Sequence, residues 1–327
     1  MAVDIGRRQF ISALGSATLA WPLVARSQES GRTYRLGFLI PTPRESPVVA
    51  AFFDELRRNG FVEGQNLIVI PGGFAIPNDQ IASFAASLVA ASPDVIVAGP
   101  ELPLRALQRL TRTVPLIGIT EDMVGDGLVA SLARPGGNIT GMSLLSPQLD
   151  GKRQEILIEA VPGVRKIAVL ADSNVTAPAH LQELKDAARG RGIEALVRGV
   201  AKRADVISAI GDVKVSGAQA INFLATPMFS INAADFIRHV TTLSLPSIYQ
   251  WPEDAEDGAL IGYGPRFMET YRERARIVVK VLQGAKPADI PVEQPTRFEL
   301  VINLQAAKAI GHEVPAGLVA RADKVIE

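Results

Sequence analysis

The segment LIGITEDMVGDGLVASLARPGGNITGM, residues 116–142, decides the fold. It begins with a short apolar run at 116–119, which predicts a buried strand. An acidic loop follows at 120–122. The sequence PGGN at 135–138 is a strong turn signal, because glycine adopts positive φ without steric cost, and a second strand is predicted at 139–142. We interpret this segment as the end of one α/β array and the bridge into another.

The acidic loop marks the expected position of a binding site. In open α/β sheets, ligands bind beyond the carboxyl ends of the strands, and Thr120, Glu121 and Asp122 directly follow a predicted strand. A carboxylate such as that of Asp122 can hold a ligand ammonium through charge-assisted hydrogen bonds. The same side chain can instead cap a helix, since Asp is a preferred N-cap residue.

Strands and helices alternate on both sides of this segment. Apolar runs at 34–40, 67–70 and 95–98 are separated by amphipathic helical patterns, and the same alternation returns from 154 to 263. This order predicts parallel sheets with right-handed crossovers. A chain of 327 residues is long enough for about two domains. The predicted fold class is therefore α/β, with two doubly wound lobes built on parallel sheets.

The carboxyl-terminal part follows a different pattern. A long helix is predicted at 267–283, because its apolar residues recur at helical spacing. A strand at 299–303, a short helix at 304–310 and a terminal helix at 317–326 are expected to follow.

Composition excludes several classes of function. Basic and acidic residues balance at 34 each, without a basic block, so nucleic acid is not an expected partner. The absence of cysteine excludes disulfides, thiolate metal sites and a cysteine nucleophile. No HExxH, GxSxG or GxxxxGKS spacing is present, and the histidines are scattered at His180, His239 and His312. We therefore expect no catalysis, no metal and no cofactor.

The amino terminus predicts an export signal. The pair Arg7-Arg8 precedes an uncharged, mostly apolar run at 11–25, and small residues precede an expected cleavage after Ser27. The run is shorter than the about 20 residues that span a bilayer core, and it lacks the polar face of an amphipathic helix. The arginine pair resembles a twin-arginine signal. Residues 1–27 are therefore expected to direct the chain to the periplasm.

A series of sequence blocks carries a resemblance to a known family. The blocks are YGP at 263–265, KVLQGAKPAD at 280–289 and PVEQPTRFELVIN at 291–303, preceded by GFVEGQN at 60–66 and DVIVAG at 94–99. In this order they resemble the ABC-transporter substrate-binding family of the tryptophan/tyrosine transport type. The resemblance covers nearly the whole chain.

This resemblance implies a type I periplasmic-binding fold, in which two α/β lobes joined by three crossing segments close on a ligand about a hinge. The crossings are expected near 141–146, 262–265 and 295–299, and the long helix would return to the first lobe. The expected bounds are 33–142 with 265–295 for lobe 1, and 143–264 with 296–327 for lobe 2.

The resemblance also implies a function. The chain would be the periplasmic, monomeric solute-binding component of an ABC importer. It would capture a small polar or aromatic, amino-acid-like solute and deliver it to a membrane permease whose ATPase drives transport. A ligand sensor that feeds a membrane receptor is the alternative on this fold. Four loops depart from the family's usual pattern, at Glu101, at Met123, at 172–173 and at 252–255, so the identity of the ligand is not carried over.

Site residues are expected at the strand ends of both lobes. In lobe 1, Pro41 and Thr42 follow the first strand, Glu101 follows the third, and Thr120 and Asp122 follow the fourth. The added acid at Glu101 favours a more cationic or polyhydroxylated ligand.

The expected site residues of lobe 2 also follow strands: Ser173, Asn174, Thr176, Met228, Phe229, Tyr249 and Trp251. The first three precede a helix, where hydroxyls and free backbone N–H groups suit a carboxylate, although simple capping explains them equally well. The aromatic side chains can stack on a ligand ring or pack in the core.

Overall fold

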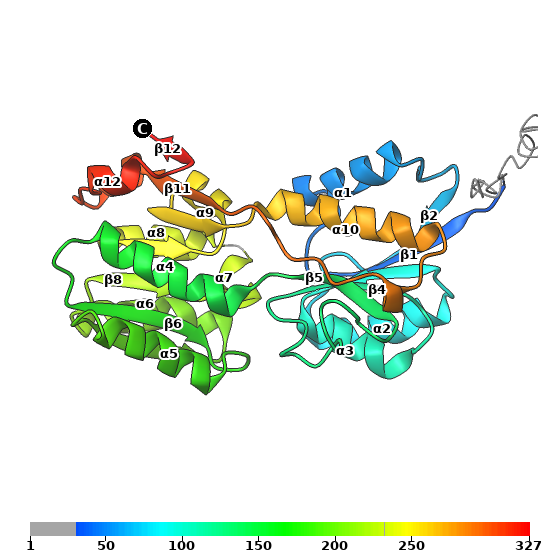
Figure 1. The fold of residues 1–327 in the computed structure, drawn as a ribbon, viewed down its shortest axis with the longest axis horizontal. Coiled ribbons are helices and arrows are strands. Elements are labelled where there is room, and N and C mark those ends of the chain that lie inside the picture. Colours follow the sequence, from blue (N-terminus) through cyan, green and yellow to red (C-terminus); the bar gives the residue numbers. More distant parts are fainter. Residues whose placement is uncertain (1–30, 232) are drawn as a thin grey trace, which may run out of the picture. The chain divides into compact units, whose positions relative to one another are not determined.

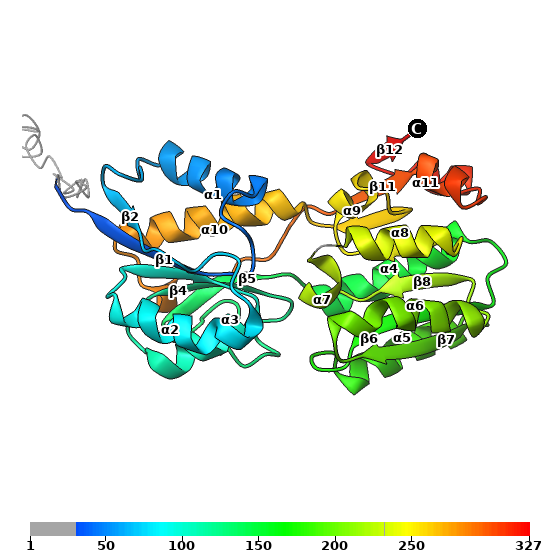
Figure 2. The same ribbon diagram turned by 180° about the vertical axis from the view of Figure 1, so that it is seen from behind.

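The computed structural model describes residues 31–231 and 233–327, so the predicted export signal at 1–27 lies outside the described residues. Residues 33–327 form one compact unit. It contains a five-stranded sheet of order β2-β1-β3-β4-β5 and a seven-stranded sheet of order β12-β11-β10-β9-β8-β6-β7 (Figures 1 and 2). The paired strands are parallel except for β10 and β11, which are antiparallel. The predicted α/β class is confirmed.

The first sheet consists of β1 (Tyr34–Leu39), β2 (Leu67–Val69), β3 (Val95–Ala98), β4 (Leu116–Thr120) and β5 (Ile139–Ser143). Its helices are α1 (Pro47–Arg58), α2 (Ile81–Ala90), α3 (Glu101–Leu110) and α10 (Phe267–Leu282). Successive side chains of a strand point to opposite faces. Val97 accordingly packs in a cluster with α1 and α10, whereas Ile96 packs in a cluster with α2 and α3. Both faces of the sheet are therefore buried, as parallel sheets require.

The second sheet consists of β6 (Lys166–Asp172), β7 (Glu194–Val200), β8 (Ala220–Phe223), β9 (Ser247–Tyr249), β10 (Ile261–Gly264), β11 (Glu299–Asn303) and β12 (Lys324–Ile326). Its longer helices are α4 (Ser146–Ala160), α5 (Pro178–Arg189), α6 (Val206–Val215) and α8 (Ala234–Thr242). Ile221 packs with α6 and α8, and Ala220 packs with α4 and α5 on the other face. Four short helices complete the set: α7 (Pro227–Ser230), α9 (Pro252–Glu256), α11 (Leu304–Ala309) and α12 (Ala316–Val319).

The terminal helix predicted at 317–326 is wrong. Only α12, a single turn, forms there, and β12 then pairs parallel with β11 in the register Val301↔Lys324. The backbone N–H of Asp323 also donates to the carbonyl of Leu300. Pairing with an available sheet edge outweighs the local helical pattern, and the β-branched residues Val325 and Ile326 suit a strand.

The chain passes three times between the two sheets. It leaves the first sheet between β5 and α4, returns between β10 and α10, and leaves again between η3 (Pro287–Asp289) and β11. These passages confirm the three crossing segments that the resemblance implied. The first and third lie side by side, because Glu293 donates its N–H to the carbonyl of Gly141 at 2.8 Å and accepts from Ser143 at 3.0 Å. Between crossings, α10 packs against α1 (Figures 1 and 2).

Glycine is required where β4 meets β5. Gly118 and Gly141 lie opposite each other in the register, and Gly141 has a φ of +144°. A Cβ at Gly141 would clash with the backbone of Gly118. The second strand of the segment that decides the fold therefore depends on a residue without a side chain.

Candidate functional site

A cavity of about 80 Å³ lies beyond the carboxyl ends of β1, β3 and β4. This is the position that the topology of an open α/β sheet favours for a ligand. Residues of both lobes and of α10 line it, and most of them are apolar. Ile40, Pro100 and Leu144 follow strands of the first sheet, and Pro227, Ile231 and Trp251 lie in segments that follow β8 and β9 of the second.

Three aromatic side chains form one wall of the cavity. The ring centroids of Trp251 and Phe267 lie 4.7 Å apart, and the ring of Tyr271 meets that of Phe267 edge-on at 5.3 Å. The Tyr271 hydroxyl shares a hydrogen bond of 2.7 Å with the hydroxyl of Thr42, which follows β1. This bond fixes α10 against the first sheet at the cavity.

Arg274 is a buried cation in the lining of this cavity. Its side chain is 1% exposed, and its Cζ lies 4.2 Å from the centroid of the Tyr271 ring. Nε and Nη2 have no hydrogen-bond partner among the described residues. Burial lowers the pKa of the Arg274 guanidinium from its ordinary value, although the group stays charged at neutral pH because its ordinary pKa is so high.

Glu121 is the acid of the cavity lining. Its carboxylate accepts hydrogen bonds from the hydroxyl of Ser146, in the first turn of α4, and from Gln250 Nε2, which lies 3.1 Å from Oε2. Burial raises the pKa of the Glu121 carboxyl, because a low dielectric disfavours the charged form. Glu121 therefore connects the end of β4 with the first crossing and with the residue that follows β9.

Four of the residues predicted for the site line the cavity: Pro41, Thr42, Thr120 and Trp251. All four follow or end a strand, as the strand-end argument expected.

The two predicted acids lie elsewhere. Asp122 Oδ1 accepts the backbone N–H groups of Val124 at 3.2 Å and Gly125 at 2.9 Å, so this carboxylate stabilises a local turn. Glu101 begins α3 and forms an ion pair with Arg105. Neither side chain lines the cavity.

The remaining candidates of lobe 2 also lie outside the cavity lining: Ser173, Asn174, Thr176, Met228, Phe229 and Tyr249. Asn174 donates its side-chain amide to Asp172 Oδ1 and to the carbonyl of Ala201, both at 2.9 Å. Tyr249 stacks on Phe223 at 4.5 Å between centroids, and Phe229 packs edge-on against the same ring. These two aromatic side chains belong to the core of the second sheet.

The contribution of α10 to the cavity was not predicted from the sequence. Phe267, Tyr271 and Arg274 recur at spacings of three and four, which places them on one helical face. That face continues into the buried Val278. A charged residue in the apolar stripe of a helix is unusual, and this was the signal in the sequence that could have identified Arg274.

A buried polar cluster supports the crossings near the cavity. Asp150 accepts hydrogen bonds from Arg153 Nη1 at 2.6 Å and from the N–H of Ala225 at 3.0 Å, and its second oxygen lies 3.2 Å from His180 Nε2. Arg153 Nε donates to the carbonyl of Tyr263 at 2.8 Å. Hydrogen bonding to Asp150 raises the pKa of His180. The cluster joins α4, which follows the first crossing, to the end of β10, which precedes the second.

Among the described residues, no group of three or more His, Asp or Glu side chains is arranged to hold a metal ion. The described helices are all too short or too polar to cross a membrane.

Comparison with known proteins agrees with this architecture. A tyrosine-binding protein of Clostridioides difficile (strain R20291) is 25% identical over 276 residues, which cover 83% of this chain and 79% of that protein. The structure of a conserved domain protein from Vibrio cholerae superposes with a TM-score of 0.81 at 27% identity, covering 90% of this chain and all of that one. An ABC domain from Streptococcus pneumonia in complex with L-Trp gives a TM-score of 0.78 at 22% identity, with the same coverage.

The profile of one family matches most of the chain. It is described as ABC transporter substrate binding protein, and the match covers residues 46–326. Members of this family bind a small solute outside the cytoplasmic membrane and work with an ABC permease. The chain belongs to the ABC transporter substrate-binding protein family and has the type I periplasmic-binding fold.

Proposed function

We propose that this protein captures a small polar or aromatic, amino-acid-like solute in the cavity lined by Trp251, Phe267 and Tyr271, and delivers it to a membrane permease. The observation that supports this most strongly is the composition of the cavity lining. It combines apolar and aromatic walls with a few polar groups, as small-molecule sites do, and it takes residues from segments that follow strands of both sheets and from α10.

Capture requires the two lobes to move. Ligand pockets usually measure about 300 Å³ or more, whereas this cavity measures about 80 Å³. The crossing segments act as the hinge about which the cavity widens to admit the solute and then closes on it. A solute that contacts both lobes only when they are closed needs about 5.5 kcal/mol of differential affinity to shift a 1:99 population to 99:1.

The related proteins support an aromatic, amino-acid-like solute. One is a tyrosine-binding protein, and another was solved in complex with L-Trp. The aromatic wall of this chain suits a flat ring, since aromatic pairs prefer offset or edge-on contacts.

The cellular setting follows from the same proposal. Residues 1–27 act as an export signal of the twin-arginine type, and the protein then works as a monomer in the periplasm. Residues 33–142 with 265–295 move as lobe 1, and residues 143–264 with 296–327 move as lobe 2. The protein has no enzymatic activity of its own.

A thermal-shift screen of amino acids, aromatic acids and small sugars tests this function. A solute at 100 times its Kd stabilises the protein by about 2.7 kcal/mol, which raises Tm by several degrees. We expect one chemical class to raise Tm in the wild-type protein and to lose this effect in Trp251→Ala. If no solute raises Tm, or if Trp251→Ala responds like the wild type, the proposed function is wrong.

A further inference from the structure

We propose that Arg274 is the anion-binding residue of the cavity, and that the solute is a carboxylic acid with an apolar or aromatic body. This inference rests on the proposed function and specifies its substrate class. It also goes beyond an amino-acid-like solute, because it makes the carboxylate the required group and the α-ammonium dispensable.

Arg274 is fully buried, yet its Nε and Nη2 have no hydrogen-bond acceptor among the described residues. The guanidinium also forms no ion pair with any described residue. A buried charge is costly unless it is paired and hydrogen-bonded. An unpaired guanidinium in the lining of a cavity is therefore available to a ligand anion, and its planar fork matches a carboxylate with two parallel hydrogen bonds.

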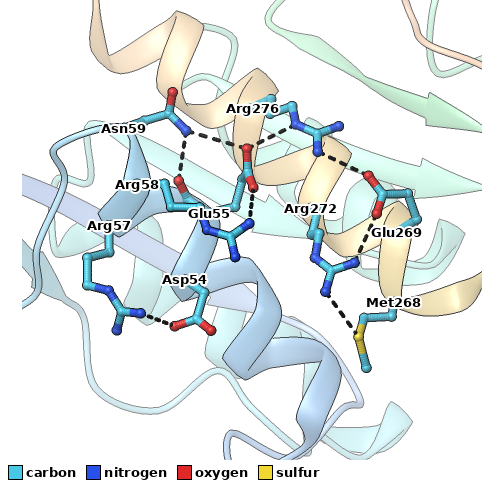
Figure 3. A network of polar contacts seen from close by, with 9 residues as sticks. All are labelled: Asp54, Glu55, Arg57, Arg58, Asn59, Met268, Glu269, Arg272 and Arg276. Atoms are coloured by element: carbon cyan, nitrogen blue, oxygen red, sulfur yellow. Dashed lines mark hydrogen bonds and ion pairs between the residues drawn. The ribbon is translucent and has the colours of Figure 1, made fainter.

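The neighbouring arginines of α10 pair with acids (Figure 3). Arg272 donates to Glu269, and Arg276 donates to both Glu55 and Glu269, each at 3.0 Å. Both side chains are partly exposed, at 34% and 44%. Glu55 and Glu269 thus pair with partly exposed arginines, while no acid among the described residues forms an ion pair with the fully buried Arg274.

Arg274 is held in place without being neutralised. Its guanidinium lies over the face of Tyr271, and such a cation–π contact is favourable in a desolvated site. The Tyr271 hydroxyl is in turn bonded to Thr42. The ring and its hydroxyl partner therefore orient the guanidinium and leave Nε and Nη2 without protein acceptors.

The two charged side chains that line the cavity differ in how they are paired. Among the described residues that line it, the only acid is Glu121, and the only base is Arg274. The Glu121 carboxylate already accepts hydrogen bonds from Ser146 and Gln250. Asp122, predicted to hold a ligand ammonium, instead binds the backbone of its own turn. The cavity thus offers an unpaired cation for a carboxylate, but no uncommitted carboxylate for an ammonium.

Three probes with the same phenyl ring separate these requirements. 3-Phenylpropionate carries only the carboxylate, L-phenylalanine carries both groups, and 2-phenylethylamine carries only the ammonium. In isothermal titration calorimetry we expect 3-phenylpropionate to bind at least as tightly as L-phenylalanine, and 2-phenylethylamine not to bind. If 3-phenylpropionate does not bind, or if the amine binds as tightly, the inference is overturned.

Arg274→Met tests the residue itself, and Arg276→Met is the matched control two positions along the same helix. A charged hydrogen-bonding partner is worth about 1.5–3 kcal/mol, so Arg274→Met should weaken 3-phenylpropionate about 10- to 150-fold. Arg276→Met should leave its affinity unchanged. Equal affinities for Arg274→Met and the wild type would overturn the inference.

A purely structural role for Arg274 gives a different result without any solute. Since no acid among the described residues pairs with the guanidinium, Arg274→Met should keep or raise the Tm of the unliganded protein while binding is weakened. A fall in Tm with unchanged binding would show that the arginine serves the fold and overturn the assignment.

Failure of this inference can be told apart from failure of the proposed function. If a sugar or an amine raises the Tm of the wild-type protein and 3-phenylpropionate does not, the solute-binding function stands and the carboxylate assignment falls. If no compound of the screen binds, both fall.

Discussion

Gln250 Nε2 lies 3.1 Å from Glu121 Oε2, so a residue that follows β9 of the second sheet donates directly to a residue that follows β4 of the first. Ser146, at the start of α4, donates to the same carboxylate. These hydrogen bonds join the two lobes beside the cavity. They stabilise the arrangement in which residues of both lobes line it.

Glu121→Gln should gain stability relative to the wild type as pH rises. Burial raises the pKa of Glu121 in the folded protein, so the folded state binds the proton more tightly than the unfolded state does. The stabilisation that this gives is fully present below the unfolded pKa of about 4.3. It is lost as pH rises through the higher folded pKa. Gln does not titrate. Urea denaturation at about pH 4 and pH 8 measures the difference, with exposed Glu313→Gln as the control. A difference from the wild type that does not change with pH would contradict this assignment.

His180→Asn should destabilise the protein more at acidic than at basic pH. The hydrogen bond to Asp150 raises the pKa of His180, so its contribution is fully present below an unfolded pKa of about 6.5 and is lost as pH rises through the folded pKa. A hydrogen bond to a charged group is worth about 1.5–3 kcal/mol. Urea denaturation at about pH 5.5 and pH 9 checks this, with His239→Asn as the control. Equal losses at both pH values would show that His180 does not titrate in contact with Asp150.

Arg153→Met should destabilise the protein strongly, in contrast to Arg274→Met. Both arginines are fully buried, but Arg153 is paired with Asp150 and bonded to the carbonyl of Tyr263. Removing one partner of a buried ion pair costs about 3–5 kcal/mol, because the other charge is left uncompensated. Urea denaturation at neutral pH measures the loss, and adding Asp150→Asn should restore part of it. A loss below about 1 kcal/mol would mean that this pair does not hold the crossings together.

Gly141→Ala should lower the free energy of unfolding by more than the about 1–3 kcal/mol that a strained backbone conformation costs. Its φ of +144° is unfavourable for any L side chain, and the new Cβ would also clash with the backbone of Gly118. Gly137→Ala, in the preceding turn, is the control, because nothing lies within 4 Å of a Cβ there. Chemical denaturation of both variants checks the contrast. Equal stabilities would show that β4 and β5 can separate without cost.

Most of the fold could be predicted from the sequence because its local and global signals agree. The apolar run at the start of the segment 116–142 became β4, and the second strand predicted at 139–142, after the glycine-rich turn, became β5. The prediction failed at 317–326, where a strand forms by pairing with β11. That outcome depends on a sheet edge contributed by another part of the chain, which a local pattern does not contain.

The candidate site was predicted only in part, for a similar reason. The sequence pattern predicts where strands end, and Thr42, Thr120 and Trp251, which lie at or after strand ends, do line the cavity. The pattern could not show which loop carboxylates would accept hydrogen bonds from the backbone of their own turn, as that of Asp122 does. It also could not show that α10, far along the chain, brings Tyr271 and Arg274 to the ends of β1 and β4.

The central claim is that a solute binds in the cavity against Trp251. The chain contains two tryptophans, so a Trp21→Phe variant leaves Trp251 as the single emitter. Titrating this variant with 3-phenylpropionate should give a saturable change in tryptophan emission and protect Trp251 from quenching by acrylamide. If calorimetry detects bound solute while the emission and quenching of Trp251 stay unchanged, the solute binds elsewhere and the account is contradicted.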